Sequence, residues 1–250
     1  MLLYIAKILA RYPKDDKDLL YSLTFLEMAF QNDKVQKINT HREIGLDVAR
    51  KGEDATVFTV REGNHKIYMD EQVGENRIDL VADRAMEICD EYEALIIKVD
   101  DTGVGGGVTD ILIGKNYPVY PINFGQKPII DPERYYDAKS EMHHHLRMKY
   151  RNQTICDYQI KNEKKLVQAM QMKTYLDPRK QKRRVLDVKN APELFKRVKK
   201  KHSPDIMDSE GFAFYPIDII SPVTIIDDDI EYEWDSDPIH AGEFHDPIFN

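Results

Sequence analysis

Cysteine is scarce in this chain of 250 residues, which contains only two, Cys89 and Cys156. Neither belongs to a C-x-x-C pair, so the sequence offers no disulfide framework and no zinc pattern, and we expect a reducing, intracellular setting. Long apolar runs are also lacking, since no stretch approaches the ~20 residues that a membrane-spanning helix needs. The apolar start MLLYIAKILA has no basic leader and no small-residue cleavage site, so we do not expect a signal peptide.

Positive charge is missing from the end of the chain. Residues 217–250 contain ten Asp or Glu and no Lys or Arg, which leaves 34 acids and 36 bases in residues 1–216. We expect an acidic tail there, because no clear apolar period runs through it. Basic residues concentrate in 173–201, with twelve Lys or Arg against three acids. Such a region either neutralises phosphates or is a solvated charged face, and charge alone does not decide between the two.

Glycines cluster at one place, in the stretch VDDTGVGGGVTD of residues 99–110, directly after an apolar run. A dinucleotide-binding loop requires G-x-G-x-x-G, but counting from Gly103 puts Val108 where the third glycine belongs. The Walker pattern G-x-x-x-x-G-K-[ST] occurs nowhere in the chain. We therefore do not expect a nucleotide at this loop.

Short apolar segments alternate along the chain with segments of helical period. Three consecutive strands, two of them joined by a hairpin turn at 62–64, are expected to pair antiparallel, and a later apolar run has the character of a strand buried on both faces. The expected strands are 43–50, 55–61, 65–71, 94–99, 117–124, 171–176 and 183–188, and the expected helices are 75–92, 106–115, 132–151, 162–171, 191–202 and 203–215.

Three consecutive histidines, His143, His144 and His145, fall inside the expected helix 132–151. Successive helix positions point ~100° apart, so the three cannot all face one metal ion. The spacing H-x-x-x-H is also absent. We interpret them as a partly exposed helical face. Cys89 falls on the apolar face of helix 75–92 and is expected to pack rather than react.

Acidic residues occur in apolar surroundings at three places. Asp47 and Asp100 lie in strand-like apolar runs, and Asp205 and Asp208 are three apart on one helix, so their side chains share a face. Because a charge in a core setting is costly unless it is paired or bound to a metal, three or four gathered carboxylates suggest Mg²⁺ or Mn²⁺. Two such ions ~4 Å apart can promote phosphodiester hydrolysis. Alternatively, Asp47 pairs with Arg50 or another base, and Asp100 and Asp208 are helix-cap or surface residues, which spacing alone does not exclude.

The glycines have a plain role in the metal hypothesis. They let the chain turn sharply after Asp100, and they keep side chains away from an approaching DNA backbone.

Three segments carry a pattern of acids and glycines that is more specific than any one of them: GLDVARKGEDATVF at 45–58, VDDTGVGGGVTDIL at 99–112 and KKHSPDIMDSEGF at 200–212. Together they resemble the C-terminal nuclease domain of the large terminase subunit of tailed bacteriophages. The family pattern is approximately D-x-A-x-x-G-x-D-x-T, then (V/I)-D-x-x-G-x-G-x-x-V-x-D, then S-P-D-x-x-D-A. Residues 135–150 are similar to the helix between the family's second and third acids. Residues 8–29 are similar to the segment that joins its ATPase motor to the nuclease.

The resemblance implies a ribonuclease H-like α/β fold, in which helices flank a central mixed β-sheet. It implies that Asp47, Asp100 and Asp208 are the catalytic metal ligands for two Mg²⁺ or Mn²⁺ ions, with Asp205 as an additional ligand or as a residue that supports the ligands. Ser209 departs from the pattern, since the family usually has alanine there. Four residues are less certain members of the surroundings: Glu53, Asp54, Asp101 and His202.

The resemblance also implies an organisation and a function. We expect a linker-like helical segment at 1–40, a nuclease domain at 41–216 and the acidic tail at 217–250. The nuclease would cut double-stranded DNA during viral genome packaging, in the cytoplasm of the infected host cell. Its partners would be the small terminase subunit, the portal protein and the ATPase domain of the same subunit. Without a Walker motif, this chain is not expected to hydrolyse ATP.

The basic region is expected to hold the DNA backbone through phosphates rather than bases. Two rival hypotheses remain. One is another ribonuclease H-like enzyme, such as a junction resolvase or an integrase; the other is a DNA-binding or portal-docking module that is inactive as a nuclease in isolation. The residues assigned to DNA binding are Lys180, Lys182, Arg183, Arg184, Lys199 and Lys200.

Overall fold

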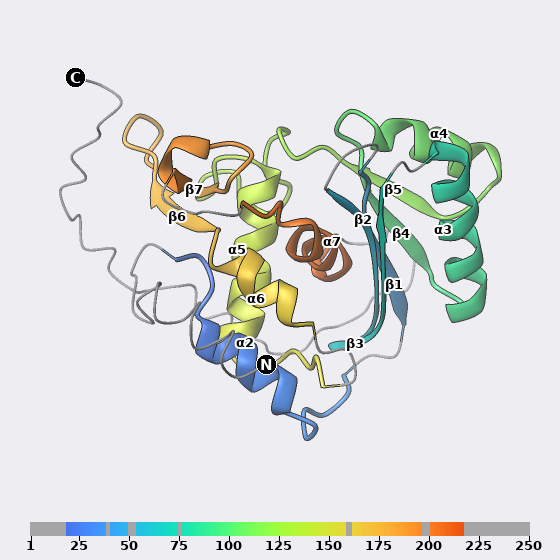
Figure 1. The fold of residues 1–250 in the computed structure, drawn as a ribbon, viewed down its shortest axis with the longest axis horizontal. Coiled ribbons are helices and arrows are strands. Elements are labelled where there is room, and N and C mark those ends of the chain that lie inside the picture. The colour runs from blue at the N-terminus through green and yellow to red at the C-terminus, as the bar shows by residue number, and fades with distance from the viewer. Residues whose placement is uncertain are drawn as a thin grey trace. The chain divides into compact units, whose positions relative to one another are not determined.

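Five strands form one mixed sheet in the order β3-β2-β1-β4-β5 (Figure 1). β1 (Arg42–Asp47) pairs antiparallel with β2 (Ala55–Glu62) and parallel with β4 (Ile96–Asp100). β3 (His65–Val73) extends the antiparallel half of the sheet, and β5 (Val119–Ile122) extends the parallel half. The expected antiparallel pairing of the first three strands is therefore confirmed, as is the expected mixed sheet.

The structure is a computed structural model. The acidic tail from residue 218 on, the first eighteen residues, Glu53, Lys199 and Lys200 lie outside the residues that it describes. No helix within those residues is long and apolar enough to cross a bilayer. The described residues are 19–38, 41–49, 54–74, 77–158, 162–196 and 201–217.

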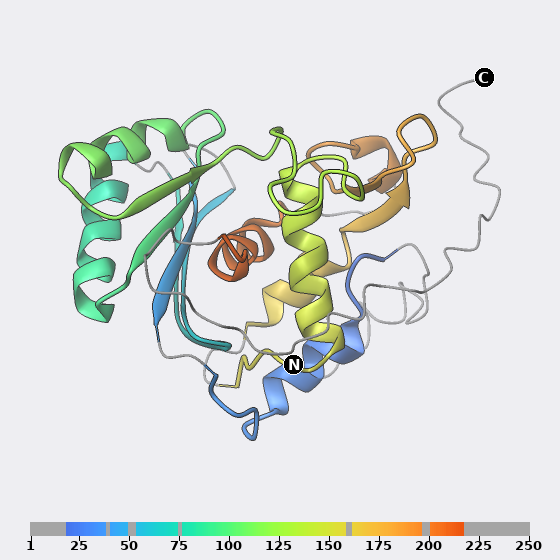
Figure 2. The same ribbon diagram turned by 180° about the vertical axis from the view of Figure 1, so that it is seen from behind.

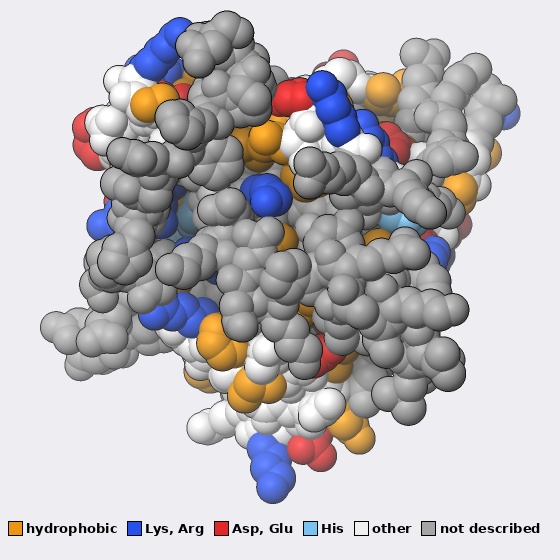
Figure 3. All heavy atoms as spheres, turned by 60° about the vertical axis from the view of Figure 1, so that its left-hand side comes forward, with side chains coloured by type: hydrophobic (Ala, Val, Ile, Leu, Met, Phe, Trp, Pro, Cys, Tyr) orange, Lys and Arg blue, Asp and Glu red, His pale blue; other side chains and the backbone are white. Residues whose placement is uncertain are grey.

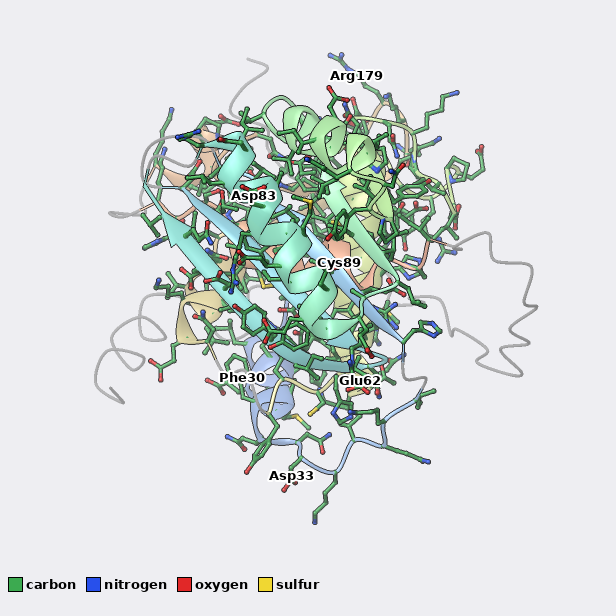
Figure 4. The ribbon with its side chains drawn as sticks, turned by 90° about the vertical axis from the view of Figure 1, so that its right-hand side faces the viewer. Phe30, Asp33, Glu62, Asp83, Cys89 and Arg179 are labelled. Carbon is green, nitrogen blue, oxygen red and sulfur yellow. The ribbon has the colours of Figure 1, made fainter. Side chains whose placement is uncertain are left out.

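Helices cover both faces of the sheet. α3 (Ile78–Tyr92) and α4 (Gly105–Gly114) lie on one face, whereas α7 (Asp205–Phe214) lies on the other, between the sheet and α5 (Ala138–Arg151) (Figures 1 and 2). The apolar side of α3 packs against the sheet, and together they form a large hydrophobic core. Cys89 of α3 is only 5% exposed, which confirms its packing role (Figure 4).

A second core lies on the α5 side of the molecule. α2 (Leu23–Gln31) and α6 (Glu163–Ala169) pack there with α5 and the inner side of α7. β6 (Lys173–Leu176) and β7 (Arg183–Leu186) form a separate antiparallel hairpin, as expected. The sheet and its partner helices are thus the frame on which the candidate site is built.

α7 approaches the sheet closely because β1 carries a glycine. A Cβ on Gly45 would lie 2.0 Å from the carbonyl oxygen of Ser209 and 2.4 Å from the nitrogen of Ala213, so a larger residue would force α7 outward. The hydroxyl of Ser209 uses this closeness, donating a hydrogen bond of 2.9 Å to the Gly45 carbonyl oxygen. The serine that departs from the family pattern therefore fastens α7 to β1.

A buried ion network anchors the other side of α7. Glu210 is fully buried and lies 3.3 Å from Lys66 of β3 and 2.6 Å from Lys165 of α6. Lys165 also pairs with buried Asp157 at 2.5 Å. Paired charges of this kind cannot be broken singly without stranding a buried charge, so they fix where α7 lies.

The interpretation of the three histidines was wrong. His143, His144 and His145 are 0%, 2% and 8% exposed, because α5 is enclosed by α2, α7 and β7 rather than lying at the surface. α5 also begins at Ala138, later than expected, where the Asp137 side chain accepts a hydrogen bond from the backbone N–H of Ser140. An enclosed helix with polar side chains must satisfy them internally, so the histidines needed partners within the fold.

The expected helix 191–202 is present only as a single 3₁₀ turn, η1 (Pro192–Phe195), in the described residues. Residues 197–200 lie outside the described ranges. The helix expected from residue 203 is α7, which starts two residues later than the pattern placed it.

Candidate active site

The parallel pairing of β1 and β4 brings two acids to one edge of the sheet. Leu46 pairs with Val99, so Asp47 and Asp100, the next residue of each strand, end side by side. Ligands of open α/β sheets characteristically bind just outside such carboxyl ends. The expectation that these two acids end adjacent strands is confirmed.

α7 brings two more carboxylates to the same edge. Asp205 is its first residue and Asp208 lies one turn further on, with exposures of 4% and 1%. The Asp205 carboxylate accepts a hydrogen bond of 2.9 Å from the backbone N–H of Ala55. Because β2 begins at Ala55 and pairs Val57 with Asp47, this bond ties the start of α7 to the end of β1.

The glycine stretch supports Asp100. A Cβ on Gly105 would lie 1.6 Å from the Asp100 carbonyl oxygen, so only glycine lets α4 start directly against the end of β4. The Asp100 carboxylate accepts a hydrogen bond of 2.9 Å from the backbone N–H of Thr102, which orients it. Asp101, by contrast, places its side chain beside Gly106 in the first turn of α4.

Asp47 is the carboxylate of the group whose negative charge has the fewest direct partners. It is 5% exposed, and no other described residue gives its side chain a hydrogen bond or an ion pair. Burial raises its pKa well above the usual value, and the charges of Asp208, Asp205 and Asp100 add to the rise, against the opposing charge of Lys189. Burial also raises the pKa of Asp100 and of Asp205.

Asp208 has the opposite environment, because both of its oxygens are held. One oxygen lies 3.1 Å from the ammonium nitrogen of Lys139, and the other lies 2.7 Å from Nε2 of His143. Although burial opposes ionisation, Lys139 and His143 hold the pKa of Asp208 at about 2. Lys139 also pairs with buried Asp187 at 2.8 Å, and despite burial the two carboxylates raise its pKa.

A second lysine reaches the other side of the cluster. The ammonium nitrogen of Lys189 lies 3.3 Å from Asp205 and 3.6 Å from Asp54. Burial works against its charge, but the surrounding carboxylates, Asp47 first among them, raise its pKa. Lys189 follows β7 closely in the chain, so the hairpin and the site are continuous.

This set of side chains fits hard divalent cations. Its ligand atoms are carboxylate oxygens, the kind that Mg²⁺ and Mn²⁺ prefer. Burial raises the pKa of Asp47, Asp100 and Asp205, and at Asp47 the neighbouring acids add to the rise. Within the described ranges, no group of three or more Asp, Glu, His or Cys side chains is placed so that it could hold a metal ion as it stands. Lys139 and Lys189 neutralise part of the charge, so ion binding requires the carboxylates to turn toward the ion.

Of the four residues that the resemblance left less certain, some lie at the site and others lie beside it. Asp54 joins the site through Lys189, whereas Asp101 points along α4. His202 is half-buried. Its backbone N–H donates a hydrogen bond of 2.9 Å to the side-chain oxygen of Gln171, which fixes the segment ahead of α7. Glu53 lies outside the described residues.

Sequence reasoning missed the residues that hold the acids. Lys139 and His143 both contact Asp208, and Asp187 and Lys189 complete the charge balance. One signal was available, because Lys139 and His143 are four apart on one helix and so share a face. The spacing K-x-x-x-H could have indicated a polar face of the expected helix, but not that this face is buried against Asp208.

The residues assigned to DNA binding that the structure describes lie on the β6–β7 hairpin: Lys180, Lys182, Arg183 and Arg184. Lys180 and Arg184 both lie over the ring of Tyr136, at 3.9 Å and 4.4 Å from its centroid. The Lys182 ammonium donates a hydrogen bond of 2.5 Å to the Pro132 carbonyl oxygen. Arg179 projects outward at the upper edge of Figure 4. Among the described side chains visible in Figure 3, Lys and Arg are interspersed with apolar and acidic groups.

Comparison with solved structures finds nuclease domains of phage large terminase subunits. The nuclease domain of the large terminase subunit gp2 of bacterial virus Sf6 superposes with a TM-score of 0.66 at 16% identity, covering 78% of this chain and 98% of that one. The large terminase nuclease of thermophilic phage G20c superposes with a TM-score of 0.54 at 13% identity, covering 79% and 97%. No protein-family model and no curated protein sequence matches the chain.

The neighbours also include metal-bound forms. An Sf6 gp2 nuclease domain was solved with manganese and beta-thujaplicinol, and the G20c nuclease was solved with bound magnesium. The chain has the mixed five-stranded sheet and flanking helices of these ribonuclease H-like domains, so the fold expected from the three motifs is confirmed.

Proposed function

We propose that this chain is a metal-dependent endonuclease that hydrolyses phosphodiester bonds of double-stranded DNA during phage genome packaging. The observation that carries the proposal is the carboxylate cluster of Asp47, Asp100 and Asp208, assembled from two strand ends and a helix. It stands at the edge of a fold shared with terminase nuclease domains, some of which were solved with manganese or magnesium.

The positions of the carboxylates at one edge of the sheet support the following assignment of roles. Asp47 and Asp208 would hold one Mg²⁺ or Mn²⁺ and Asp47 and Asp100 the other, with Asp205 as an additional ligand. When bound, the two ions supply an activated water and stabilise the leaving oxygen. Lys139 and His143 hold Asp208 ionised and oriented, which suits a ligand that must be deprotonated.

The hairpin supplies the surface for the DNA backbone. Lys180 and Arg184 are presented by stacking on Tyr136, with Lys182 and Arg183 alongside them, and the strand that carries Arg183 and Arg184 leads directly to Lys189 in the site. Contacts of this kind bind phosphates with little sequence preference. Lys199 and Lys200 belong to the same proposal.

The test is cleavage of supercoiled plasmid with Mg²⁺, Mn²⁺ or EDTA. We expect metal-dependent cutting that Asp100→Asn abolishes, with a loss of at least ~100-fold if the residue is a ligand. Asp101→Asn is the matched control, because it removes the adjacent carboxylate that lies beside Gly106, and it should cut normally. Equal cutting by both variants would contradict the site assignment.

The second candidate is a DNA-binding or docking module that does not cut by itself. The observation that favours it is that the acids face Lys139 and Lys189, so the site is not a finished metal site among the described residues. Salt-dependent duplex binding with no cutting under any metal would select it. A preference for branched DNA would instead select a junction resolvase.

The partners and setting belong to the same proposal. As a packaging nuclease the chain would work in the cytoplasm of the infected cell with the small terminase subunit, the portal protein and an ATPase domain. ATP turnover by this chain would contradict the division of labour, since it carries no Walker motif.

A further inference from the structure

The hydrogen bond from His143 to Asp208 continues to a residue far away in the sequence. The hydroxyl of Tyr21 lies 2.8 Å from Nδ1 of His143, and Nε2 of the same ring lies 2.7 Å from the Asp208 carboxylate. All three side chains are at most 1% exposed. A line of three buried polar groups therefore runs from the segment ahead of α2, through α5, to the first turn of α7.

Each member of this line constrains the next. Nε2 of His143 faces the Asp208 carboxylate, and the Tyr21 hydroxyl lies within hydrogen-bond distance of both Nδ1 and, at 3.3 Å, the backbone carbonyl oxygen of His143. The partners on both sides fix the orientation of the ring. Lys139 holds the second oxygen of Asp208 at 3.1 Å. A carboxylate has about four lone-pair directions, so Asp208 keeps others free for a metal while its plane is fixed.

Tyr21 is itself held firmly. Leu20 donates a backbone hydrogen bond of 3.0 Å to Met172, and Leu19 forms a bridge with Lys173, so the segment lies beside the start of β6. The ring of Tyr21 packs edge-on against Tyr150 at a centroid distance of 6.3 Å. An apolar side chain of the same shape would fill this space equally well, so packing alone does not require the hydroxyl.

We propose that Tyr21 is a positioning residue of the nuclease site, acting through His143 to fix the orientation of the ligand Asp208. The inference rests on the proposed function, since it concerns how this chain presents a carboxylate to a divalent ion. It extends the site beyond the three motifs, because the residues around Leu19–Tyr21 become part of the catalytic unit. Hydrogen-bond partners of metal ligands typically change metal affinity by about 10- to 100-fold when they are removed.

The test uses the full chain with Tyr21→Phe, which keeps the ring and removes only the hydroxyl. Binding of Mn²⁺ alone, without DNA, is measured by calorimetry, and plasmid cleavage is measured against Mn²⁺ concentration. We expect the Kd for Mn²⁺ and the Mn²⁺ concentration at half-maximal cutting to rise about 10-fold. The matched control is Tyr68→Phe, which also loses a hydroxyl hydrogen bond, one accepted from Arg84, but lies on β3 next to α3. It should bind Mn²⁺ like the unaltered chain.

A double-mutant cycle separates this role from a general loss of packing. His143→Gln keeps an amide donor toward Asp208 but cannot keep the same link to Tyr21. In that background Tyr21→Phe should weaken Mn²⁺ binding no further. If the two substitutions acted through independent packing effects, their losses of Mn²⁺ affinity would instead add. If Tyr21→Phe melts too low for calorimetry, His143→Gln alone should still show the weaker binding.

The outcomes distinguish the two proposals. If the unaltered chain neither binds Mn²⁺ nor cuts DNA, the proposed function fails. If it does both and Tyr21→Phe matches it in Mn²⁺ affinity, the proposed function stands and the role of Tyr21 is overturned. Additive losses in the double variant would also overturn it.

Discussion

Asp47 and Asp208 are carboxylates of one cluster with opposite environments. Asp47 is buried beside other acids and has no direct partner among the described residues, whereas Asp208 is held by Lys139 and His143. Burial acts on both, but only Asp208 has charges close enough to reverse its effect. The same residue type is therefore destabilising at one position and stabilising at the other while no metal is bound.

This contrast predicts opposite effects of two matched substitutions. Without metal, Asp47→Asn should stabilise the fold, because it removes a buried carboxyl whose pKa is raised by folding. Asp208→Asn should destabilise it by ~2 kcal/mol, since Lys139 loses a buried partner. Thermal melts in EDTA measure both, and shifts of about 2–4 °C per kcal/mol are expected for a domain of this size. A lower melting temperature for Asp47→Asn would contradict the electrostatic account.

The pH dependence of stability should show the same signs. A carboxyl whose pKa is raised by folding contributes stability below its unfolded pKa and loses it as the pH rises through its folded pKa. The advantage of Asp47→Asn over the unaltered chain should therefore be largest near neutral pH and vanish toward pH ~4, the ordinary Asp value. Urea unfolding at several pH values in EDTA tests this, and an advantage that grew on acidification would refute it.

Asp208 should behave in the reverse sense. Its folded pKa of about 2 lies below the unfolded value, so its contribution is present above that unfolded value. The contribution is lost as the pH falls from ~4 toward ~2. In Asp208→Asn the acid limb of the stability curve should be correspondingly shallower over that range.

At the scale of elements, the site depends on how closely α7 lies to β1. The sheet presents Asp47 and Asp100, but the third acid comes from a helix in a different layer. Gly45 sets that distance, since any Cβ there would meet the backbone of α7. Glu210 and its lysine partners hold the helix from the opposite side.

Gly45→Ala is therefore expected to separate α7 from the sheet. We predict a loss of stability of ~3 kcal/mol, the upper end for overpacking, together with weaker Mn²⁺ binding because Asp208 moves away from Asp47. Gly114→Ala is the control, because nothing lies within 4 Å of its added Cβ. Urea unfolding and Mn²⁺ calorimetry measure the two effects, and normal values for Gly45→Ala would show that α7 can adjust.

Elements that depend on local pattern were predictable from the sequence, and those that depend on enclosure were not. The pattern of apolar residues predicted β4 and α3. The position of Asp47 and Asp100 in apolar, strand-like runs predicted them as site residues. The burial of His143 was missed because its partners, Tyr21 and Asp208, lie 122 and 65 residues away. Lys139 and Lys189 were missed for the same reason, since an ion pair between distant segments leaves no local pattern.

At the scale of the whole molecule, the basic hairpin and the acidic edge of the sheet have different roles in binding a phosphodiester. The acids require cations before they can accept phosphate, whereas Lys180, Lys182 and Arg184 can contact it directly. DNA affinity and cleavage should therefore respond to different residues.

Lys180→Ala should weaken binding of a short duplex in EDTA and lower the slope of log K against log salt by ~1, the value for one phosphate contact. Lys115→Ala is the control, because it is an exposed lysine at the end of α4, on the opposite face of the sheet. Fluorescence anisotropy at several salt concentrations measures both slopes. Equal slopes for the two variants would remove the hairpin from the DNA surface.

Lys139 and Lys189 act as counterions that belong to the protein itself. Small domains whose ligands repel one another without their ion unfold when it is chelated. Here two ammonium groups offset part of the repulsion, and the apolar core of the sheet contains none of the site carboxylates. The chain should therefore survive removal of every divalent ion and regain full occupancy when ions are returned, so that loading is a reversible step separate from folding.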